Sequence, residues 1–174
     1  MSTTPTSTEQ KQPRAIRQWT LEPARSTVEF KVRHFWGLIT VSGHFDRFGG
    51  TYIVGPDSRQ IELTIDADSL DTGNRQRDKH LRSADFFDVA AHPRTRFRSN
   101  SVVDAADGTL HVSGELEAAG KTVPLNFDAA VREIRDELGI EATTTVDHRL
   151  LGMIWSPLGT LRSPATLHVK ARLK

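Results

Sequence analysis

Apolar and polar residues alternate with a period of two along most of this chain, and this pattern constrains the fold more than any other feature. In the run STVEFKVRH, the apolar residues Val28, Phe30 and Val32 alternate with charged neighbours. Such spacing sends apolar side chains to one face of a β-strand and polar ones to the other. Similar runs begin at Val41, Ile61, Thr95, Leu110, Val123, Ile140 and Leu167. The sequence therefore predicts about eight strands, each with one face suited to a core.

Turn residues separate the predicted strands at the places that a meander requires. They are Gly49-Gly50, Gly55-Pro56-Asp57, Asp107-Gly108 and Gly120. Asp-Gly is among the strongest hairpin signals because both residues tolerate positive φ, so neighbouring strands are expected to be antiparallel. A closed sheet suits such strands better than an open one, whose edges invite aggregation. The predicted fold is all-β, an eight-stranded antiparallel barrel, and alternation alone leaves open whether its interior is filled or holds a ligand.

One segment, between residues 70 and 92, has helical rather than alternating spacing. Asn74 is a candidate N-cap of a helix, and Ser83 is a candidate start of a short second turn. Pro93 then favours extended backbone, which returns the chain to a strand. The apolar residues of the segment need a surface to pack against, and they are Leu81, Phe86 and Phe87. We therefore expect a short helical insertion that covers one end of the barrel.

The length of 174 residues predicts a single domain. Residues 1–17 are rich in Ser, Thr, Gln and Pro, so we expect a disordered tail at 1–17 and the barrel domain at 18–174. This tail has no apolar run typical of a secretory signal, which favours a cytoplasmic location. No segment approaches the roughly 20 apolar residues of a membrane-spanning helix, so no stable membrane insertion is expected. The formal net charge of +1 gives no reason to expect a nucleic-acid partner.

Motifs for catalysis and for metal binding are absent from the sequence. There is no cysteine, no Gly-x-Ser-x-Gly elbow, no phosphate-binding Gly-rich loop and no His-Glu-x-x-His. The seven histidines form no His-x-His or His-x-x-x-His pair, which argues against a metal site. We therefore predict no catalytic residue, no metal and no cofactor.

Several separated motifs resemble, in the same order, those of the YceI-like family of polyisoprenoid-binding proteins. They are WTLEPARSTVEFKVRHFWGLITVSGHFDRFGG, IDADSLDTGNRQRDKHLRSADFFDVAAHPRTRF, VSGELEAAGKTVPL and GMIW, and they span the chain from Trp19 to its C-terminus. The resemblance implies a lipocalin-like barrel that binds an isoprenoid or other long-chain amphiphile, including quinone-like lipids, in a hydrophobic lumen. It implies a role in transport, storage or sequestration rather than catalysis, and it suggests a homodimer.

With this resemblance, the inward faces and the helical insertion become a candidate lipid site. The predicted ligand-binding residues are Phe30, Val32, Phe45, Leu63, Ile65, Arg77, His80, Phe86, Phe97, Leu116, Phe127, Arg149, Met153 and Trp155. Arg77 and His80 are candidates for holding a polar or phosphorylated head at the mouth, because cations and N–H donors suit that group. The alternative for them is a solvated helix face with local ion pairs. Arg149, among apolar neighbours, is either a structural latch or a polar contact within the pocket.

Two other functions compete with lipid binding. One is a small enzyme or stress-response module that uses residues of the barrel mouth on a small substrate. The other is a filled barrel that serves only as an interaction scaffold. The shape of the interior discriminates between them: a long apolar tunnel favours the lipid carrier, a shallow polar cleft favours catalysis, and a filled core favours the scaffold.

Overall fold

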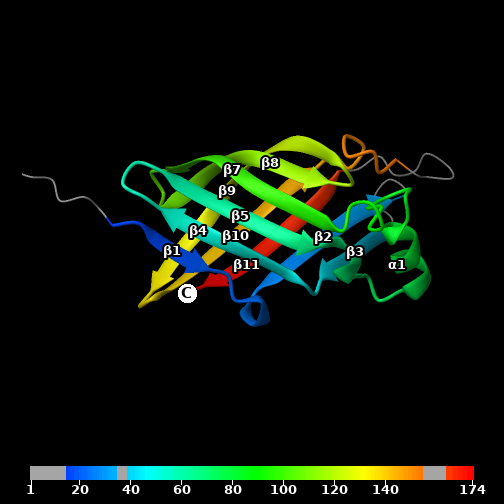
Figure 1. Cartoon of the computed structure of the whole chain (residues 1–174), viewed down its shortest axis with the longest axis horizontal. Coiled ribbons are helices and arrows are strands. Elements are labelled where there is room, and N and C mark those ends of the chain that lie inside the picture. Colours follow the sequence, from blue (N-terminus) through cyan, green and yellow to red (C-terminus); the bar gives the residue numbers. More distant parts are fainter. Residues whose placement is uncertain (1–14, 35–38, 155–163) are drawn as a thin grey trace, which may run out of the picture.

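The computed structural model describes residues 15–34, 39–154 and 164–174. Their strands curl around a common interior, and the helix α1 lies at one end (Figure 1). The strands are β1 (Arg17–Thr20), β2 (Thr27–His34), β3 (Ile39–Phe45), β4 (Phe48–Val54), β5 (Arg59–Asp66), β6 (Leu70–Asp71), β7 (Arg94–Asp104), β8 (Thr109–Ala118), β9 (Lys121–Ile134), β10 (Glu137–Val146) and β11 (Ala165–Leu173). The helix α1 spans Arg75–Arg82, and short 3-10 turns occupy Pro23–Arg25 and Ala67–Ser69.

All these strands belong to one antiparallel sheet, in the order β1-β4-β5-β7-β8-β9-β10-β11-β2-β3-β6. The curl of the sheet brings β1 against the end of β11. Thr20 and Lys174 exchange backbone hydrogen bonds of 2.7 and 3.0 Å, and Leu21 forms a bridge with Leu173. The predicted all-β antiparallel architecture and the helical insertion at one end are confirmed.

The number of strands differs from the prediction, because the described residues form eleven strands and not eight. The additional strands are β1, β4 and β6. Gly49 and Gly50, expected to form a turn, instead lie inside β4 and pair with Thr64 and Leu63 of β5. A Cβ atom at Gly50 would lie only 2.5 Å from the carbonyl oxygen of Glu62, so glycine here permits close packing of two strands rather than a chain reversal.

The other predicted turns lie where the sequence places them. The β4–β5 hairpin turns at Gly55, whose N–H donates to the Ser58 carbonyl at 2.7 Å. In the β7–β8 hairpin, the Asp107 carboxylate accepts a 3.0 Å hydrogen bond from the Thr109 N–H, and Gly108 has a φ of +82°. Gly120, with a φ of +70°, closes the β8–β9 hairpin. Glycine avoids the steric cost of this left-handed geometry.

Helix α1 begins where the capping signal predicts. The Asn74 side chain accepts a hydrogen bond of 3.0 Å from the Arg77 N–H, which satisfies one of the free donors of the first turn. Ser83 ends this helix, because its N–H and hydroxyl both donate to the His80 carbonyl, at 3.0 and 2.7 Å. Hydrogen-bonded turns, rather than a second helical segment, follow to residue 91.

Two clusters of buried side chains stabilise the sheet. The larger one includes the stacked rings of Trp19 and Tyr52, whose centroids are 5.6 Å apart. The smaller one lies towards α1 and consists of Val28, Phe30, Phe45, Ile65 and Leu70. No helix in the described ranges is long and apolar enough to cross a membrane. The predicted tail at 1–17 falls largely outside the described residues, and β1 begins at its last residue.

Candidate ligand-binding cavity

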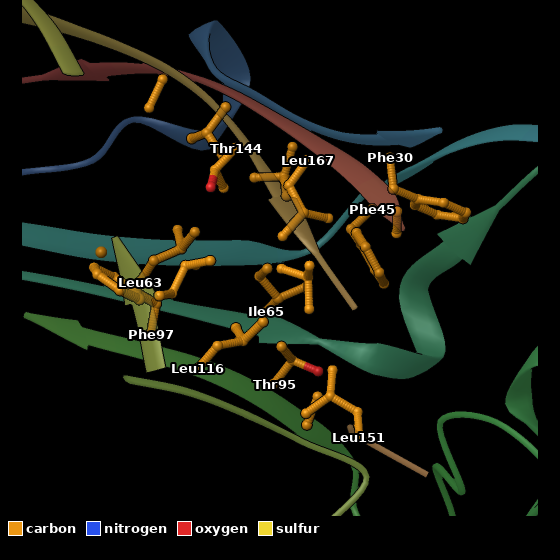
Figure 2. A pocket seen from close by; sticks show the side chains of 18 of the residues that line it. Phe30, Phe45, Leu63, Ile65, Thr95, Phe97, Leu116, Thr144, Leu151 and Leu167 are labelled. Carbon is orange, nitrogen blue, oxygen red and sulfur yellow. The ribbon is translucent and has the colours of Figure 1, made fainter. Parts of the chain in front are cut away.

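The inward faces of the sheet enclose an apolar cavity of about 440 Å³. This volume lies within the range of pockets that bury small organic ligands. Its lining comes from β2, β3, β4, β5, β7, β8, β9, β10 and β11, and from the segment that contains α1. Figure 2 shows side chains from opposite walls, Leu167 and Leu63 among them, pointing into the same interior. The interior is therefore hollow, which argues against a barrel that serves only as a filled scaffold.

Most of the predicted site residues line this cavity. They are Phe30, Val32, Phe45, Leu63, Ile65, Arg77, His80, Phe86, Phe97, Leu116, Phe127 and Met153. Strand alternation explains the members on the sheet, because every second side chain of a curled sheet points inward. The rings of Phe97 and Phe127 lie 5.3 Å apart, and those of Phe30 and Phe45 lie 5.5 Å apart. The lining thus contains two phenylalanine pairs, one from the neighbouring strands β2 and β3 and one from β7 and β9, which flank β8.

Arg149 does not belong to this lining, so the prediction that it contacts a ligand inside the pocket is wrong. Its side chain is exposed, and its Nε and Nη2 donate to the Asp147 carboxylate at 2.8 and 2.6 Å. A guanidinium keeps more of its hydration at the surface and gains a bidentate partner there. The same contact lowers the pKa of Asp147 to about 2. Trp155, the other predicted residue absent from this lining, lies outside the described residues.

A fixed cation lies at the end of the cavity that α1 covers. The half-buried Arg77 lines the cavity, and its Nε and Nη2 donate to the hydroxyl and the carbonyl of Thr72, both at 2.8 Å. The Thr72 hydroxyl in turn donates to the buried Asp78 carboxylate at 2.5 Å, and the Thr72 N–H donates to the same oxygen at 3.0 Å. These hydrogen bonds hold the guanidinium in one orientation beside an apolar chamber.

The rest of the α1 segment contributes aromatic side chains to the same end. The Phe87 ring packs edge-on against Phe45 with centroids 5.8 Å apart, and Phe86 packs edge-on against His80 at 5.2 Å. All four residues line the cavity. The predicted packing of this insertion over the barrel mouth is therefore confirmed.

Two polar residues in the lining, Thr95 and His148, were not predicted as site residues. Each is only 6% exposed, and neither Thr95 Oγ1 nor His148 Nε2 has a hydrogen-bond partner within the described part of the chain. Thr95 lies two residues before Phe97 and therefore on the same face of its strand. The sequence could thus have indicated a polar side chain on an inward face. His148 lies in a turn after β10, where strand periodicity cannot predict whether its side chain points inward.

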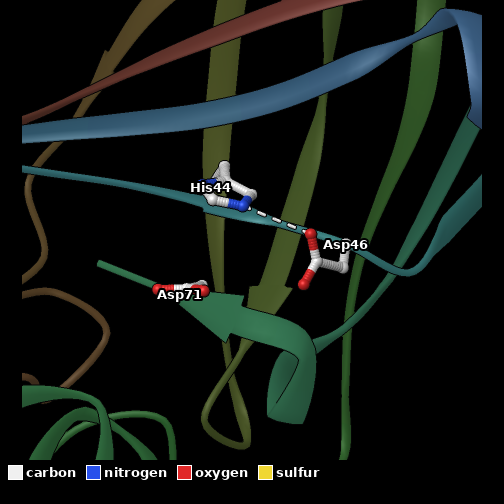
Figure 3. Close-up of side chains that lie close together, drawn as sticks. All are labelled: His44, Asp46 and Asp71. Atoms are coloured by element: carbon white, nitrogen blue, oxygen red, sulfur yellow. Dashed lines mark ion pairs between the residues drawn. The ribbon is translucent and has the colours of Figure 1, made fainter. Parts of the chain in front are cut away.

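A small polar cluster outside the cavity joins His44, Asp46 and Asp71, whose potential ligand atoms lie within 4.8 Å of one another (Figure 3). His44 Nε2 lies 3.2 Å from an Asp46 oxygen, and Asp71 accepts a 2.6 Å hydrogen bond from the Gly73 N–H. His44 and Asp46 are exposed. A surface ion pair and a turn contact account for this cluster, and the expectation that the chain binds no metal stays a prediction.

A curled antiparallel sheet around an apolar chamber defines a lipocalin-like class of fold. The YceI-like domain matches residues 19–173, and the chain belongs to the YceI-like family. A UPF0312 protein of Shewanella baltica is 34% identical over 161 residues, which cover 87% of this chain and 81% of that protein. A UPF0312 protein of Vibrio cholerae is 36% identical over 109 residues, which cover 61% of this chain and 57% of the relative's length.

Solved structures share the fold at low sequence identity. BcnA of Burkholderia cenocepacia superposes with a TM-score of 0.79 at 16% identity, over 87% of this chain and 98% of BcnA. A polyisoprenoid-binding domain from Saccharophagus degradans, implicated in plant cell wall breakdown, superposes with a TM-score of 0.71 at 18% identity. That match covers 90% of this chain and 97% of the domain. The expected lipocalin-like architecture is confirmed by these structures.

Proposed function

We propose that this protein binds an isoprenoid or a similar long-chain lipid, with the tail in the apolar cavity and the polar end towards α1. The observation that carries the proposal is the hollow, phenylalanine-lined interior of about 440 Å³. Moving an apolar chain from water into such a chamber contributes about 0.8 kcal/mol per methylene, less the entropy lost in ordering the chain. The polyisoprenoid-binding domain among the structural neighbours supports the same class of ligand.

The residues of the cavity favour binding over catalysis. Among the described lining residues, Glu62 alone carries a carboxylate, and it forms an ion pair of 2.8 Å with Arg98. His148, the buried histidine of the lining, uses its Nδ1 to contact the Met153 carbonyl. General acid–base catalysis needs a carboxylate or histidine placed against a substrate and a second group that orients it. We propose that the protein stores, carries or sequesters its lipid in this cavity. We also propose that it does so in the cytoplasm and as a homodimer.

Prenyl probes of increasing length test this function. Because each added methylene gains apolar burial, the affinity should rise with chain length and then level off once the chamber is full. The measurement is fluorescence titration of the purified protein with a series of environment-sensitive prenyl probes. Affinity that does not depend on length, or uptake that does not saturate, would contradict binding within a chamber of fixed size.

Arg77→Ala should weaken binding of a prenyl lipid that has a phosphorylated head. The guanidinium, held by Thr72 at the cavity end, forms charge-assisted hydrogen bonds that suit a phosphate. Losing it should weaken binding of a prenyl phosphate about tenfold and leave binding of the uncharged prenyl alcohol within about twofold. Arg75→Ala is the matched control, because Arg75 is an exposed cation of the same helix outside the cavity lining. If Arg75→Ala weakened binding of the prenyl phosphate as much as Arg77→Ala, the effect would come from the overall positive charge of α1 and not from a contact made by Arg77.

A further inference from the structure

We propose that Thr95 and His148 form a polar recognition point within the apolar cavity, and that it selects lipids bearing a hydroxyl group. This inference rests on the proposed lipid-binding function and adds the chemistry of the ligand's polar end. Both side chains are more than nine-tenths buried, and each carries a polar atom without a hydrogen-bond partner in the described ranges. Buried polar atoms usually have partners, since leaving one unpaired costs stability. A bound ligand would supply the missing partners.

Thr95 is placed by its strand to face the chamber. It lies at the start of β7 opposite Ile65 of β5, and the alternation that buries Phe97 also buries Thr95. Figure 2 shows its side chain among the apolar side chains of Ile65, Leu116 and Leu151. A hydroxyl can donate one hydrogen bond and accept others. Valine has nearly the same shape, so packing alone gives no reason for threonine at this position.

The contacts of His148 define what its free nitrogen can do. Its Nδ1 lies 2.6 Å from the Met153 carbonyl oxygen. A carbonyl oxygen only accepts, so Nδ1 must carry the hydrogen, and in the neutral ring Nε2 is then an acceptor. The side chain is therefore fixed by the turn that it stabilises, with an acceptor directed away from that contact.

Both residues lie at the end of the chamber that α1 covers. Thr95 follows Pro93, whose carbonyl accepts the Ala67 N–H at the 3-10 turn before β6 and α1. The turn that holds His148 packs against the β8–β9 hairpin, since a Cβ atom at Gly152 would lie 3.0 Å from Lys121 Nζ. That hairpin in turn contacts the segment that follows α1, since a Cβ atom at Gly120 would lie 2.5 Å from the His92 ring. These two contacts place the His148 turn at the α1 end of the chamber.

A hydroxyl group fits this pair better than other polar ends of a lipid. It donates to an acceptor such as His148 Nε2, and its oxygen accepts from a donor such as the Thr95 hydroxyl. A carbonyl or ether can accept from Thr95 but offers nothing to His148. The ligand class is therefore a hydroxyl-bearing prenyl lipid, either an alcohol or a reduced, quinol-type ring.

The experiment compares a prenyl alcohol with its methyl ether and with the parent hydrocarbon, all of the same chain length. Each competes with a fluorescent prenyl probe for the purified protein. The alcohol should bind roughly tenfold more tightly than the ether, because the ether leaves the His148 acceptor unpaired. A prenylated quinol and its quinone, tested in the same way, separate the aromatic from the aliphatic source of the hydroxyl.

Two variants that each lose a polar atom, with Thr95→Ser as their control, test whether this pair causes the preference for the alcohol. Thr95→Val removes the hydroxyl and keeps the shape, while Thr95→Ser keeps the hydroxyl. His148→Asn retains an N–H donor for the Met153 carbonyl but loses the second ring nitrogen. Thr95→Val and His148→Asn should each reduce the alcohol preference to about threefold or less, and Thr95→Ser should preserve it. Thr95→Val should also raise the Tm of the lipid-free protein by roughly 2–4 °C, because a buried unpaired hydroxyl is removed.

The outcomes separate this inference from the function on which it rests. Equal affinity of wild-type protein for alcohol and ether would overturn the inference while leaving lipid binding intact. A preference that survives in both Thr95→Val and His148→Asn would also overturn it. Failure of every prenyl compound to displace the probe would instead contradict the proposed function.

Discussion

Replacing Ala142 by tryptophan should lower the affinity for a prenyl chain at least about a hundredfold while the protein stays folded. Ala142 lies on β10 between Ala129 of β9 and Val169 of β11, and it lines the cavity. Because Ala142 lines the chamber of about 440 Å³, we expect an indole at this position to occupy part of that chamber. Displacing four methylene groups of a bound tail forfeits about 3 kcal/mol, which corresponds to a hundredfold loss. Titration of wild-type protein and of Ala142→Trp with the prenyl probe measures this loss of affinity.

The neighbouring strand offers a matched control for this substitution. Ala130 of β9 is exposed, lies opposite Glu141 of β10, and is outside the cavity lining. Ala130→Trp therefore adds the same side chain to the outer surface, and it should leave probe affinity within about twofold. If Ala142→Trp, folded by circular dichroism, bound the probe as tightly as Ala130→Trp, the lipid could not lie in this chamber.

The largest expected loss of stability follows from Leu70→Ala. Leu70 is fully buried on the two-residue strand β6, where it lies opposite Phe45 and packs with Val28, Phe30 and Ile65. Truncating a buried leucine removes apolar burial and leaves a cavity, so the free energy of unfolding should fall by about 3 kcal/mol. For a domain of this size the Tm should fall by roughly 6–12 °C. Denaturant titration and thermal melting both measure the change.

Leu150→Ala is the control for this loss. Leu150 is 62% exposed, in the turn after β10. Removing the same atoms at the surface should change the free energy of unfolding by less than about 0.5 kcal/mol. Similar losses in the two variants would show that β6 does not anchor the smaller buried cluster.

The sequence was sufficient to predict elements whose pattern is local. The inward faces of β2, β5 and β8, and that of β7 as far as Ser99, follow from alternation. The start of α1 follows from the Asn74 cap. The hairpin at Gly108 follows from Asp-Gly. In each case the residues within a few positions decide the geometry, so a single sequence carries the information.

The missed features depend on contacts between distant residues. Strand β4 contains a glycine pair that resembles a turn, and only the close approach of Gly50 to Glu62 explains it as a strand. Strand β6 has two residues, too few for any period. Whether the interior is hollow depends on how opposite walls meet, and the same alternation serves a filled and an empty barrel. Thr95 and His148 became visible as a pair only once the fold brought them to one cavity end.

The most direct measurement of lipid binding is mass spectrometry of an organic extract from wild-type protein and from Ala142→Trp, purified side by side from one expression host. The account predicts a prenyl or similar long-chain lipid in the wild-type extract, in proportion to protein, and little of it in the Ala142→Trp extract. Wild-type extract without any amphiphile, together with no saturable uptake of a prenyl probe, would contradict a lipid-binding cavity.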